Sequence, residues 1–345
     1  MDIGSLNEEE LKAYLTGLGE QPFRARQIFQ AIHKENVLSI NDMTTLSKNL
    51  RSALLKDQDL DKLSILKEYR SKVDDSVKLL YELADKNIIE GVLMKYKHGY
   101  SLCLSTQVGC RMGCSFCAST KEGLVRNLTP YEMCQQIYRV ERAYGINISN
   151  VILMGSGEPL DNYDNVVRFF DIINSKNGKN LSLRNITLST SGLVNRIYDL
   201  AKRKEKVNLA ISLHASRDDY RKEIMPVARR YCIEEIVSAA KFYSEQTSSR
   251  ITFEYTVIEN LNNTDADVER LSKLLSGFRS HINLIPLNPV DGFKGRGSGR
   301  RSMEILKDKL EKRGLSVTIR RSLGVDINAS CGQLRIKHLT KEVDF

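Results

Sequence analysis

The stretch Cys110-Arg-Met-Gly-Cys114-Ser-Phe-Cys117 places three cysteines within eight residues. Three thiolates at this spacing can hold three irons of a four-iron, four-sulfur cube and leave the fourth iron without a protein ligand. An iron of this kind can bind a substrate directly. The C-x3-C-x2-C run therefore predicts one [4Fe-4S] cluster, with Cys110, Cys114 and Cys117 as its ligands and one coordination position open.

A structural zinc site is the main alternative for these thiols. Zinc ligands usually come as C-x2-C pairs and a closed site needs a fourth ligand, which Cys103 could supply. A disulfide framework fits less well, because seven cysteines in 345 residues without a signal peptide are typical of a reduced protein. We therefore expect a cytoplasmic location and metal ligation.

Length and composition set the broad class of protein. A chain of 345 residues can form one large domain and a small one, and no run of about 18 apolar residues suggests a membrane span. Lys and Arg number 52 against 43 Asp and Glu, which gives a formal net charge of +9. This excess favours a polyanionic partner such as nucleic acid, although any single basic cluster is more often a solvated face.

The first 58 residues are predicted to form a small helical domain. Apolar residues recur at helical period over 6–18, 23–33 and 46–56. Arg24, Arg26, Lys48 and Arg51 are expected at its surface, where they could contact nucleic acid. A helical cap without such contacts is an equally good interpretation.

Beyond residue 58 the hydrophobic period changes twice. Residues 59–97 contain short alternating runs at 77–83 and 88–94, which predict an antiparallel connector. From 98 onward, apolar strands at 151–154, 186–189, 207–213, 251–257, 282–286 and 317–320 alternate with helical stretches. Repeated β/α units predict an α/β fold with a parallel sheet or barrel, whose active residues lie at the carboxyl ends of the strands.

Polar residues follow several of these strands. Gly155 and Gly157 flank Ser156, where glycines would let the backbone approach a ligand, and Glu158 can accept a hydrogen bond from an ammonium group. Ser189 and Ser212 are individually more typical of turns or caps, and a histidine such as His214 is more often simply buried. Together with Asn288 and the cysteine run, these residues predict a ligand pocket at the barrel mouth.

Further motifs occur in a fixed order along nearly the whole chain. They are Cys103, Gln107-Val-Gly-Cys110, Arg126-Asn-Leu128, Gly157-Glu158-Pro159, Leu188-Ser-Thr-Ser-Gly192, Ser212-Leu-His214, Asn283-Leu-Ile-Pro286 and Ala329-Ser-Cys331-Gly-Gln-Leu334. In this order they resemble the RlmN/Cfr family of radical S-adenosylmethionine RNA methyltransferases. Ser156 departs from the family pattern, which has a larger apolar residue there.

The resemblance implies a fold and a set of ligands. Residues 98–345 would form a partial (β/α)6 barrel with a C-terminal catalytic-cysteine segment, and residues 1–58 would resemble a helix-hairpin-helix RNA-binding module. The cluster would cleave S-adenosylmethionine reductively. The contacts implied for S-adenosylmethionine are Gly157, Glu158, Ser189, Ser212, Leu213, His214 and Asn288.

The resemblance also implies catalytic roles for three residues. Cys331 would be methylated by one S-adenosylmethionine, and a radical from a second molecule would convert the methyl group into a methylene radical that attacks adenine. Cys103 would then resolve the protein–RNA crosslink by forming a disulfide with Cys331, while Glu90 removes the ring proton. Without the resemblance, Cys103 and Cys331 have a plain reading as small buried hydrophobes, and a strand glutamate such as Glu90 usually faces solvent.

Three functions are weighed from the sequence. The first is methylation of adenosine carbon-2 in the peptidyl-transferase region of 23S rRNA and beside the tRNA anticodon. The second is Cfr-type methylation at carbon-8, which would use the same catalytic residues, and the third is a non-catalytic, zinc-stabilised RNA-binding protein. For the first two, we expect a monomer and a flavodoxin- or ferredoxin-like electron donor.

Overall fold

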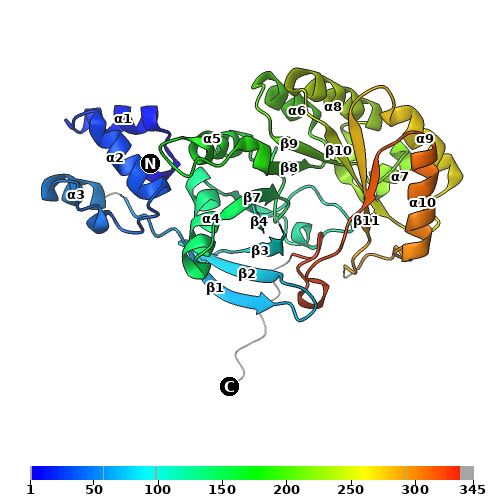
Figure 1. The fold of residues 1–345 in the computed structure, drawn as a ribbon, viewed down its shortest axis with the longest axis horizontal. Coiled ribbons are helices and arrows are strands. Elements are labelled where there is room, and N and C mark those ends of the chain that lie inside the picture. Colours follow the sequence, from blue (N-terminus) through cyan, green and yellow to red (C-terminus); the bar gives the residue numbers. More distant parts are fainter. Residues whose placement is uncertain (1, 57, 98, 291, 335–345) are drawn as a thin grey trace.

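A ten-stranded sheet organises the computed structural model, which describes residues 2–56, 58–97, 99–290 and 292–334 (Figure 1). The basic tail residues Arg335, Lys337 and His338 lie outside the described residues. The strands, in sheet order, are β1 (Leu63–Arg70), β2 (Val77–Leu83), β3 (Ile88–Tyr96), β4 (Gly99–Cys103), β7 (Ile148–Leu153), β8 (Ile186–Thr190), β9 (Asn208–Ser212), β10 (Ile251–Val257), β11 (Ser280–Pro286) and β12 (Val317–Ile319).

The strands from β4 to β12 in this order pair in parallel. The helices that connect them are α4 (Pro130–Tyr144), α5 (Tyr163–Asn174), α6 (Val194–Lys202), α7 (Asp218–Ile224), α8 (Ile233–Thr247), α9 (Asp265–Leu275) and α10 (Arg300–Lys312). The predicted α/β fold with a partial (β/α)6 barrel is therefore confirmed; β12 is the strand predicted at 317–320, and β4 is a parallel strand beyond the six predicted. None of the described helices is both long and apolar enough to cross a membrane.

The antiparallel strands continue the barrel sheet. β1, β2, β3 and β4 pair in antiparallel order, and β4 then pairs in parallel with β7. One sheet therefore runs from the hairpin of β1 and β2 into the barrel. A separate ribbon of β5 (Gln107–Gly109) and β6 (Leu124–Asn127) frames the segment that carries the three clustered cysteines.

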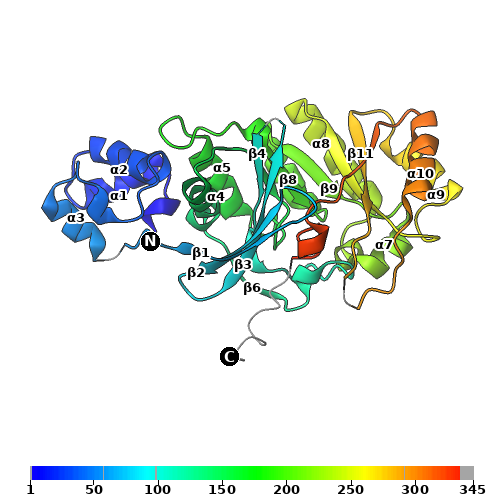
Figure 2. The ribbon, with the colours of Figure 1, turned by 60° about the horizontal axis from the view of Figure 1, so that its bottom comes forward.

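The N-terminal helices α1 (Glu8–Gly17), α2 (Phe23–His33) and α3 (Lys48–Leu55) lie at one end of the molecule (Figures 1 and 2). Helix α1 begins at Asn7 in a capping box with Glu10, which satisfies two backbone donors at the helix start. Apolar residues of these helices belong to the same continuous core as residues of α4 and α5. The helical domain is thus packed onto the barrel.

The four basic residues expected at the surface of this domain differ in their environment. Arg24 donates to the side chain of Gln27 at 2.8 Å, and Arg51 donates to the carbonyl of Asn41 at 2.7 Å. Arg26 and Lys48 are exposed. Two of the four cations therefore brace the domain, and the other two face solvent.

His33 lies at the junction between the helical domain and the barrel. It is fully buried, and its Nδ1 lies 3.1 Å from the hydroxyl of Tyr138 on α4. Burial lowers the pKa of His33 to about 3, so the folded protein excludes a proton that the unfolded chain binds below about pH 6.5. This histidine therefore stabilises the fold above that pH, and its contribution is lost as the pH falls.

We expect His33→Phe to change the pH dependence of stability. Below about pH 6.5 the free energy of unfolding of the wild type should fall by about 1.4 kcal/mol per pH unit more than that of the variant. The reason is that only the wild-type chain has a histidine at this position, which binds a proton when the protein unfolds. Urea unfolding of both proteins at pH 7 and pH 5, followed by tyrosine fluorescence, measures the difference. Parallel changes in the two proteins would contradict the prediction.

Candidate active site

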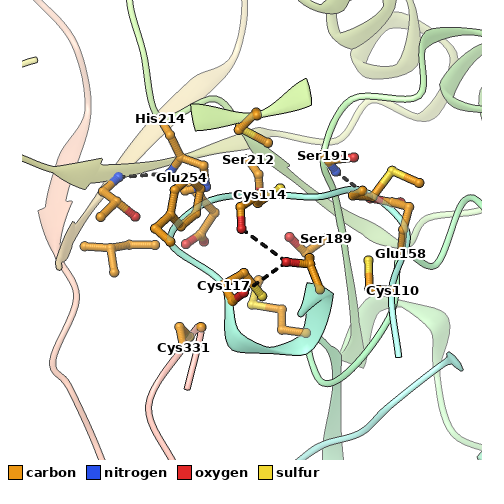
Figure 3. A pocket seen from close by; sticks show the side chains of 18 of the residues that line it. Cys110, Cys114, Cys117, Glu158, Ser189, Ser191, Ser212, His214, Glu254 and Cys331 are labelled. Carbon is orange, nitrogen blue, oxygen red and sulfur yellow. Dashed lines mark hydrogen bonds between the residues drawn. The ribbon is translucent and has the colours of Figure 1, made fainter. Parts of the chain in front are cut away.

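The three clustered cysteines lie in a loop that begins at the end of β5 and ends at a short 3-10 helix, Ala118–Thr120. The loop is held by its backbone: the N–H of Cys110 donates to Gly123 at 2.9 Å, and the N–H of Cys117 donates to Cys114 at 3.1 Å. All three cysteines line one cavity at the carboxyl ends of the barrel strands (Figure 3). The predicted position of the cysteine run at the barrel mouth is therefore confirmed.

Burial governs the protonation of these thiols. It raises the pKa of Cys110 to about 12 and also raises the pKa values of Cys114 and Cys117. A bound metal would therefore have to displace the thiol protons. Among the described residues, no three His, Cys, Asp or Glu side chains are close enough to hold a single ion. Three thiols that line one cavity fit a cube, in which each thiolate binds a different iron.

Glu158 lines the same cavity, on the side where Cys110 lies (Figure 3). It is buried, and its carboxylate oxygens accept from the N–H groups of Leu160 at 3.0 Å and Ser191 at 2.7 Å. Burial raises the pKa of this carboxyl, and these hydrogen bonds oppose the rise. A carboxylate offers about four acceptor positions, so Glu158 can also accept from a ligand ammonium group.

The two glycines before Glu158 are required by the protein's own chain. A Cβ atom on Gly155 would lie 2.6 Å from the carbonyl carbon of Leu104, and one on Gly157 would lie 2.8 Å from the backbone nitrogen of Gln107. Gly157 also has a φ of +109°. The interpretation that these glycines mainly admit a ligand is therefore incomplete, because close backbone packing alone requires them.

The other residues implied as S-adenosylmethionine contacts divide into two groups. Ser189, Ser212, His214 and Asn288 line the cavity. Leu213 does not line it: its side chain is fully buried in the hydrophobic core, so only its backbone lies near the strand end.

His214 is a neutral histidine. Its Nδ1 accepts from the N–H of Thr256 at 3.0 Å, and its ring meets the Phe116 ring edge-on with centroids 4.9 Å apart. Burial, followed by the charge of Arg221, lowers the pKa of His214 to about 3. The imidazole is therefore uncharged at neutral pH, and it can offer only hydrogen bonding and packing to a ligand.

Arg221 on α7 is a structural residue of the site that the sequence reading missed. It is fully buried and donates to the carbonyls of Ser191 at 2.7 Å, Ser212 at 3.0 Å and Leu213 at 3.1 Å. These bonds join the ends of β8 and β9 to one another. No local pattern marked this arginine, because its partners are carbonyl groups on other elements.

Glu254 and Arg320 also line the cavity and were not predicted. They form an ion pair in which Nη1 and Oε2 are 3.3 Å apart, and Glu254 is buried. Glu254 had a usable signal, since it is the one charged residue in the strand 251–257. Because a glutamate is rarely buried without a polar partner, a carboxylate in a barrel strand indicates polar groups inside the barrel.

Cys331 reaches the same cavity from the C-terminal segment (Figure 3). Its carbonyl accepts from Nδ2 of Asn288 at 3.1 Å, and the carbonyl of the next residue, Gly332, accepts from the N–H of Ala118 at 2.8 Å. A Cβ atom on Gly332 would lie 2.9 Å from the carbonyl oxygen of Phe116. The glycine therefore lets the segment carrying Cys331 lie directly against the cysteine loop.

Cys103 lies outside the lining of this cavity, at the end of β4. It is half-buried and packs against a small apolar cluster that includes Ala329 and Leu334, which flank Cys331 in sequence. Burial, and next the proximity of Cys331, raises the pKa of Cys103 to about 12. All seven cysteines of the chain are free thiols in this structure.

Glu90 on β3 also lies outside the main cavity. The reading of this glutamate as a solvent-facing strand residue is wrong, because only 3% of it is exposed. It lines a second cavity together with Ala118, Ser119 and Leu334. Glu90 is therefore adjacent to the end of the cysteine loop and to the segment that follows Cys331.

Comparisons with known proteins agree with this arrangement. Residues 104–275 match the model of the radical SAM superfamily, and residues 1–58 match that of the ribosomal RNA large subunit methyltransferase N-terminal domain. The crystal structure of a radical SAM methyltransferase from Sphaerobacter thermophilus superposes with a TM-score of 0.91 at 40% identity, covering 97% of this chain and 99% of that one.

Similar sequences extend over almost the full length. A protein of Alkaliphilus oremlandii is 49% identical, covering 98% of each chain, and one of Finegoldia magna is 48% identical, covering 98% of this chain and 97% of its own. Each is described as a probable dual-specificity RNA methyltransferase RlmN. The chain therefore belongs to the RlmN family of methyltransferases within the radical S-adenosylmethionine superfamily.

Proposed function

We propose that this enzyme methylates carbon-2 of an adenosine in the peptidyl-transferase region of 23S rRNA and of the adenosine beside the tRNA anticodon. The dual specificity in the names of its relatives supports two RNA substrates. The observation that carries the proposal is the position of Cys331, a cysteine outside the cysteine loop that opens into the same cavity.

The substrate chemistry explains why an additional thiol is needed. Carbon-2 of adenine is electron-poor and bears no acidic proton, so it cannot attack the methyl group of S-adenosylmethionine as a nucleophile. A methyl group held on Cys331 can instead be activated as a radical beside the cavity. This arrangement requires two S-adenosylmethionine molecules in each turnover, used one after the other.

The described residues fit both cofactors. Cys110, Cys114 and Cys117 would hold the cluster, and the polar lining formed by Glu158, Ser189, Ser212, His214 and Asn288 would receive S-adenosylmethionine. When bound, such a cluster would supply single electrons, giving one to cleave S-adenosylmethionine and accepting one as the product forms.

The thiols and Glu90 would carry the remaining steps. The Cys331 thiolate first takes a methyl group by displacement. After hydrogen is removed from that group, its carbon bonds to adenine and joins the RNA to the protein. Resolution then breaks the bond between the Cys331 sulfur and the methylene carbon and forms a disulfide with Cys103. The ring proton passes to Glu90, a proton equivalent to that of the Cys103 thiol ends on the methylene carbon, and the electron left by the adduct would return to the cluster, so that no net electron is consumed in forming the disulfide.

The remaining partners belong to the same proposal. A flavodoxin- or ferredoxin-like protein would supply electrons, and the enzyme would act as a monomer in the cytoplasm. Membership of an enzyme family argues against a non-catalytic zinc protein. An anaerobic visible spectrum tests the cofactor separately, because an iron–sulfur cluster absorbs broadly and zinc does not.

The test is anaerobic incubation of reconstituted enzyme, S-adenosylmethionine and reductant with protein-free rRNA and tRNA. Nucleoside mass spectrometry with authentic standards then identifies the product, and 2-methyladenosine is expected in both RNAs. Finding 8-methyladenosine in rRNA alone would assign the enzyme to the Cfr-type activity. Finding no methylated adenine in either RNA, in a preparation with an intact cluster, would overturn the substrate assignment.

A further inference from the structure

Lys78 is a buried lysine on β2 that forms an ion pair with Glu90. Its Nζ lies 2.7 Å from Oε1 of Glu90, and the side chains of the two residues are only 9% and 3% exposed. The desolvation free energy of two buried charges often exceeds the free energy of their attraction. A buried ion pair is therefore weak evidence of a role in stability. A role in the chemistry of Glu90 is a better explanation of this lysine.

The strand register places Lys78 on the face of the sheet that carries both Glu90 and Cys103. Lys78 pairs opposite Val92 on β3, and Val92 pairs opposite Cys103 on β4. Residues directly opposite one another across neighbouring strands share a face, and so do residues two apart on one strand, such as Glu90 and Val92. The lysine, the carboxylate and the resolving thiol therefore lie on one surface.

The C-terminal segment covers this surface. Ala329 and Leu334, on either side of Cys331, pack with Val92 and Cys103 in one apolar cluster. Lys78 contributes a polar contact to the same segment, since its Nζ lies 3.4 Å from the carbonyl oxygen of Asn328. Lys78 thus touches both the carboxylate and the segment that carries Cys331.

The turn between β1 and β2 holds the beginning of this segment. The hydroxyl of Ser71 donates to Asp326 at 2.7 Å, and the N–H of Gly324 donates to the carboxylate of Asp74 at 2.9 Å. Figures 1 and 2 show the red C-terminal segment lying against the blue β1–β2 hairpin. The hairpin that supplies Lys78 is therefore also the surface on which the Cys331 segment is docked.

We propose that Lys78 is a positioning residue for proton removal from the RNA adduct, an inference that rests on the function proposed above. In that step the ring C–H bond breaks, its electron pair stays in the ring, and the proton moves to a carboxylate oxygen of Glu90. A buried carboxyl group without a nearby positive charge favours the protonated form, which cannot accept this proton. The Lys78 ammonium group favours the ionised form of Glu90 and fixes the orientation of the Glu90 carboxylate. The contact between Lys78 and the Asn328 carbonyl holds this carboxylate beside the segment that carries Cys331.

The test compares Lys78→Met, which keeps the length of the side chain, with Lys78→Arg, which keeps the charge. Lys95→Met is the matched control, because Lys95 is an exposed lysine on the neighbouring strand β3. Each reconstituted enzyme, methylated at Cys331, reacts with RNA in a single turnover. Three products are measured: 5'-deoxyadenosine, the protein–RNA crosslink on a denaturing gel, and methyladenosine.

We expect Lys78→Met to form 5'-deoxyadenosine and crosslink normally but to resolve the crosslink at least about tenfold more slowly, because the loss of a charge-assisted contact is of that size. Lys78→Arg should recover most of the rate, and Lys95→Met should match the wild type. The crosslink remaining per 5'-deoxyadenosine is the deciding ratio, because partial misfolding lowers both quantities together. If the methionine variant does not fold, Lys78→Gln gives the same ratio with a neutral hydrogen-bond donor.

Two results would overturn the proposal. One is resolution at the wild-type rate in a folded, uncharged Lys78 variant. The other is an equal loss of all three products in folded variants, which would assign Lys78 a purely structural role. Failure of the proposed function is distinguishable, because the wild-type enzyme itself would then form neither crosslink nor methylated RNA.

Discussion

Replacing Cys331 by alanine is expected to abolish RNA methylation while the cluster is retained. Cys331 lies in a segment separate from the loop that carries the three clustered cysteines, although it opens into the same cavity. Alanine cannot accept the first methyl group, so the loss of activity should be on the order of 1,000-fold or more. The measurements are mass spectrometry of the RNA nucleosides and iron and sulfide content with a visible spectrum.

Cys232→Ser provides a matched control for this experiment. Cys232 is a half-buried cysteine that precedes α8, and serine is a favourable residue at a helix N-cap. Its activity should equal that of the wild type. Normal methylation by Cys331→Ala would remove Cys331 from the mechanism, whereas loss of the cluster in that variant would assign the cysteine to metal binding instead.

Replacing Cys103 by alanine is expected to trap the RNA on the protein. The thiol lies beside the apolar residues that flank Cys331, so it is placed to attack the Cys331 sulfur when that sulfur carries the RNA. Without it the thioether bond has no route to a disulfide. We expect release of methylated RNA to fall at least about 100-fold, with crosslinked RNA accumulating in proportion to the 5'-deoxyadenosine formed.

A denaturing gel with labelled RNA measures this adduct, and protease digestion with mass spectrometry locates it on Cys331. Cys103→Ala combined with Cys331→Ala is the appropriate control, since it lacks the attachment point and should form no adduct. Recovery of only free, fully methylated RNA from Cys103→Ala would eliminate the resolving role of this thiol.

Much of the fold followed from local patterns. The period of the apolar residues predicted the strands of the barrel and the three N-terminal helices, because each pattern reflects which face of one element is buried. No range was predicted for the short helices α6 and α7. Helix α7 begins with Asp218 and Asp219 and offers few apolar positions, so its pattern is weak.

Local patterns predicted some residues of the site and not others. The three cysteines were found from spacing alone, and the strand-end residues Ser189, Ser212 and Asn288 were found because parallel strands deliver their carboxyl ends to one edge. The side chain of Leu213 is buried in the core, so the ligand contact predicted there would have to involve its backbone. Side-chain direction at a strand end depends on tertiary packing, which sequence motifs do not specify.

Local sequence features predicted the kind of chemistry expected of this protein. The order of the motifs predicted the family, which the comparisons confirm, and the spacing of the cysteine run predicts the cluster ligands, because ligand spacing is a local property of the chain. The tertiary structure alone decided which distant groups meet: Lys78 with Glu90, Arg221 with the carbonyls of two strand ends, and Cys331 with the cysteine loop. Those contacts depend on strand register and on the packing of the C-terminal segment, and no stretch of sequence encodes either by itself.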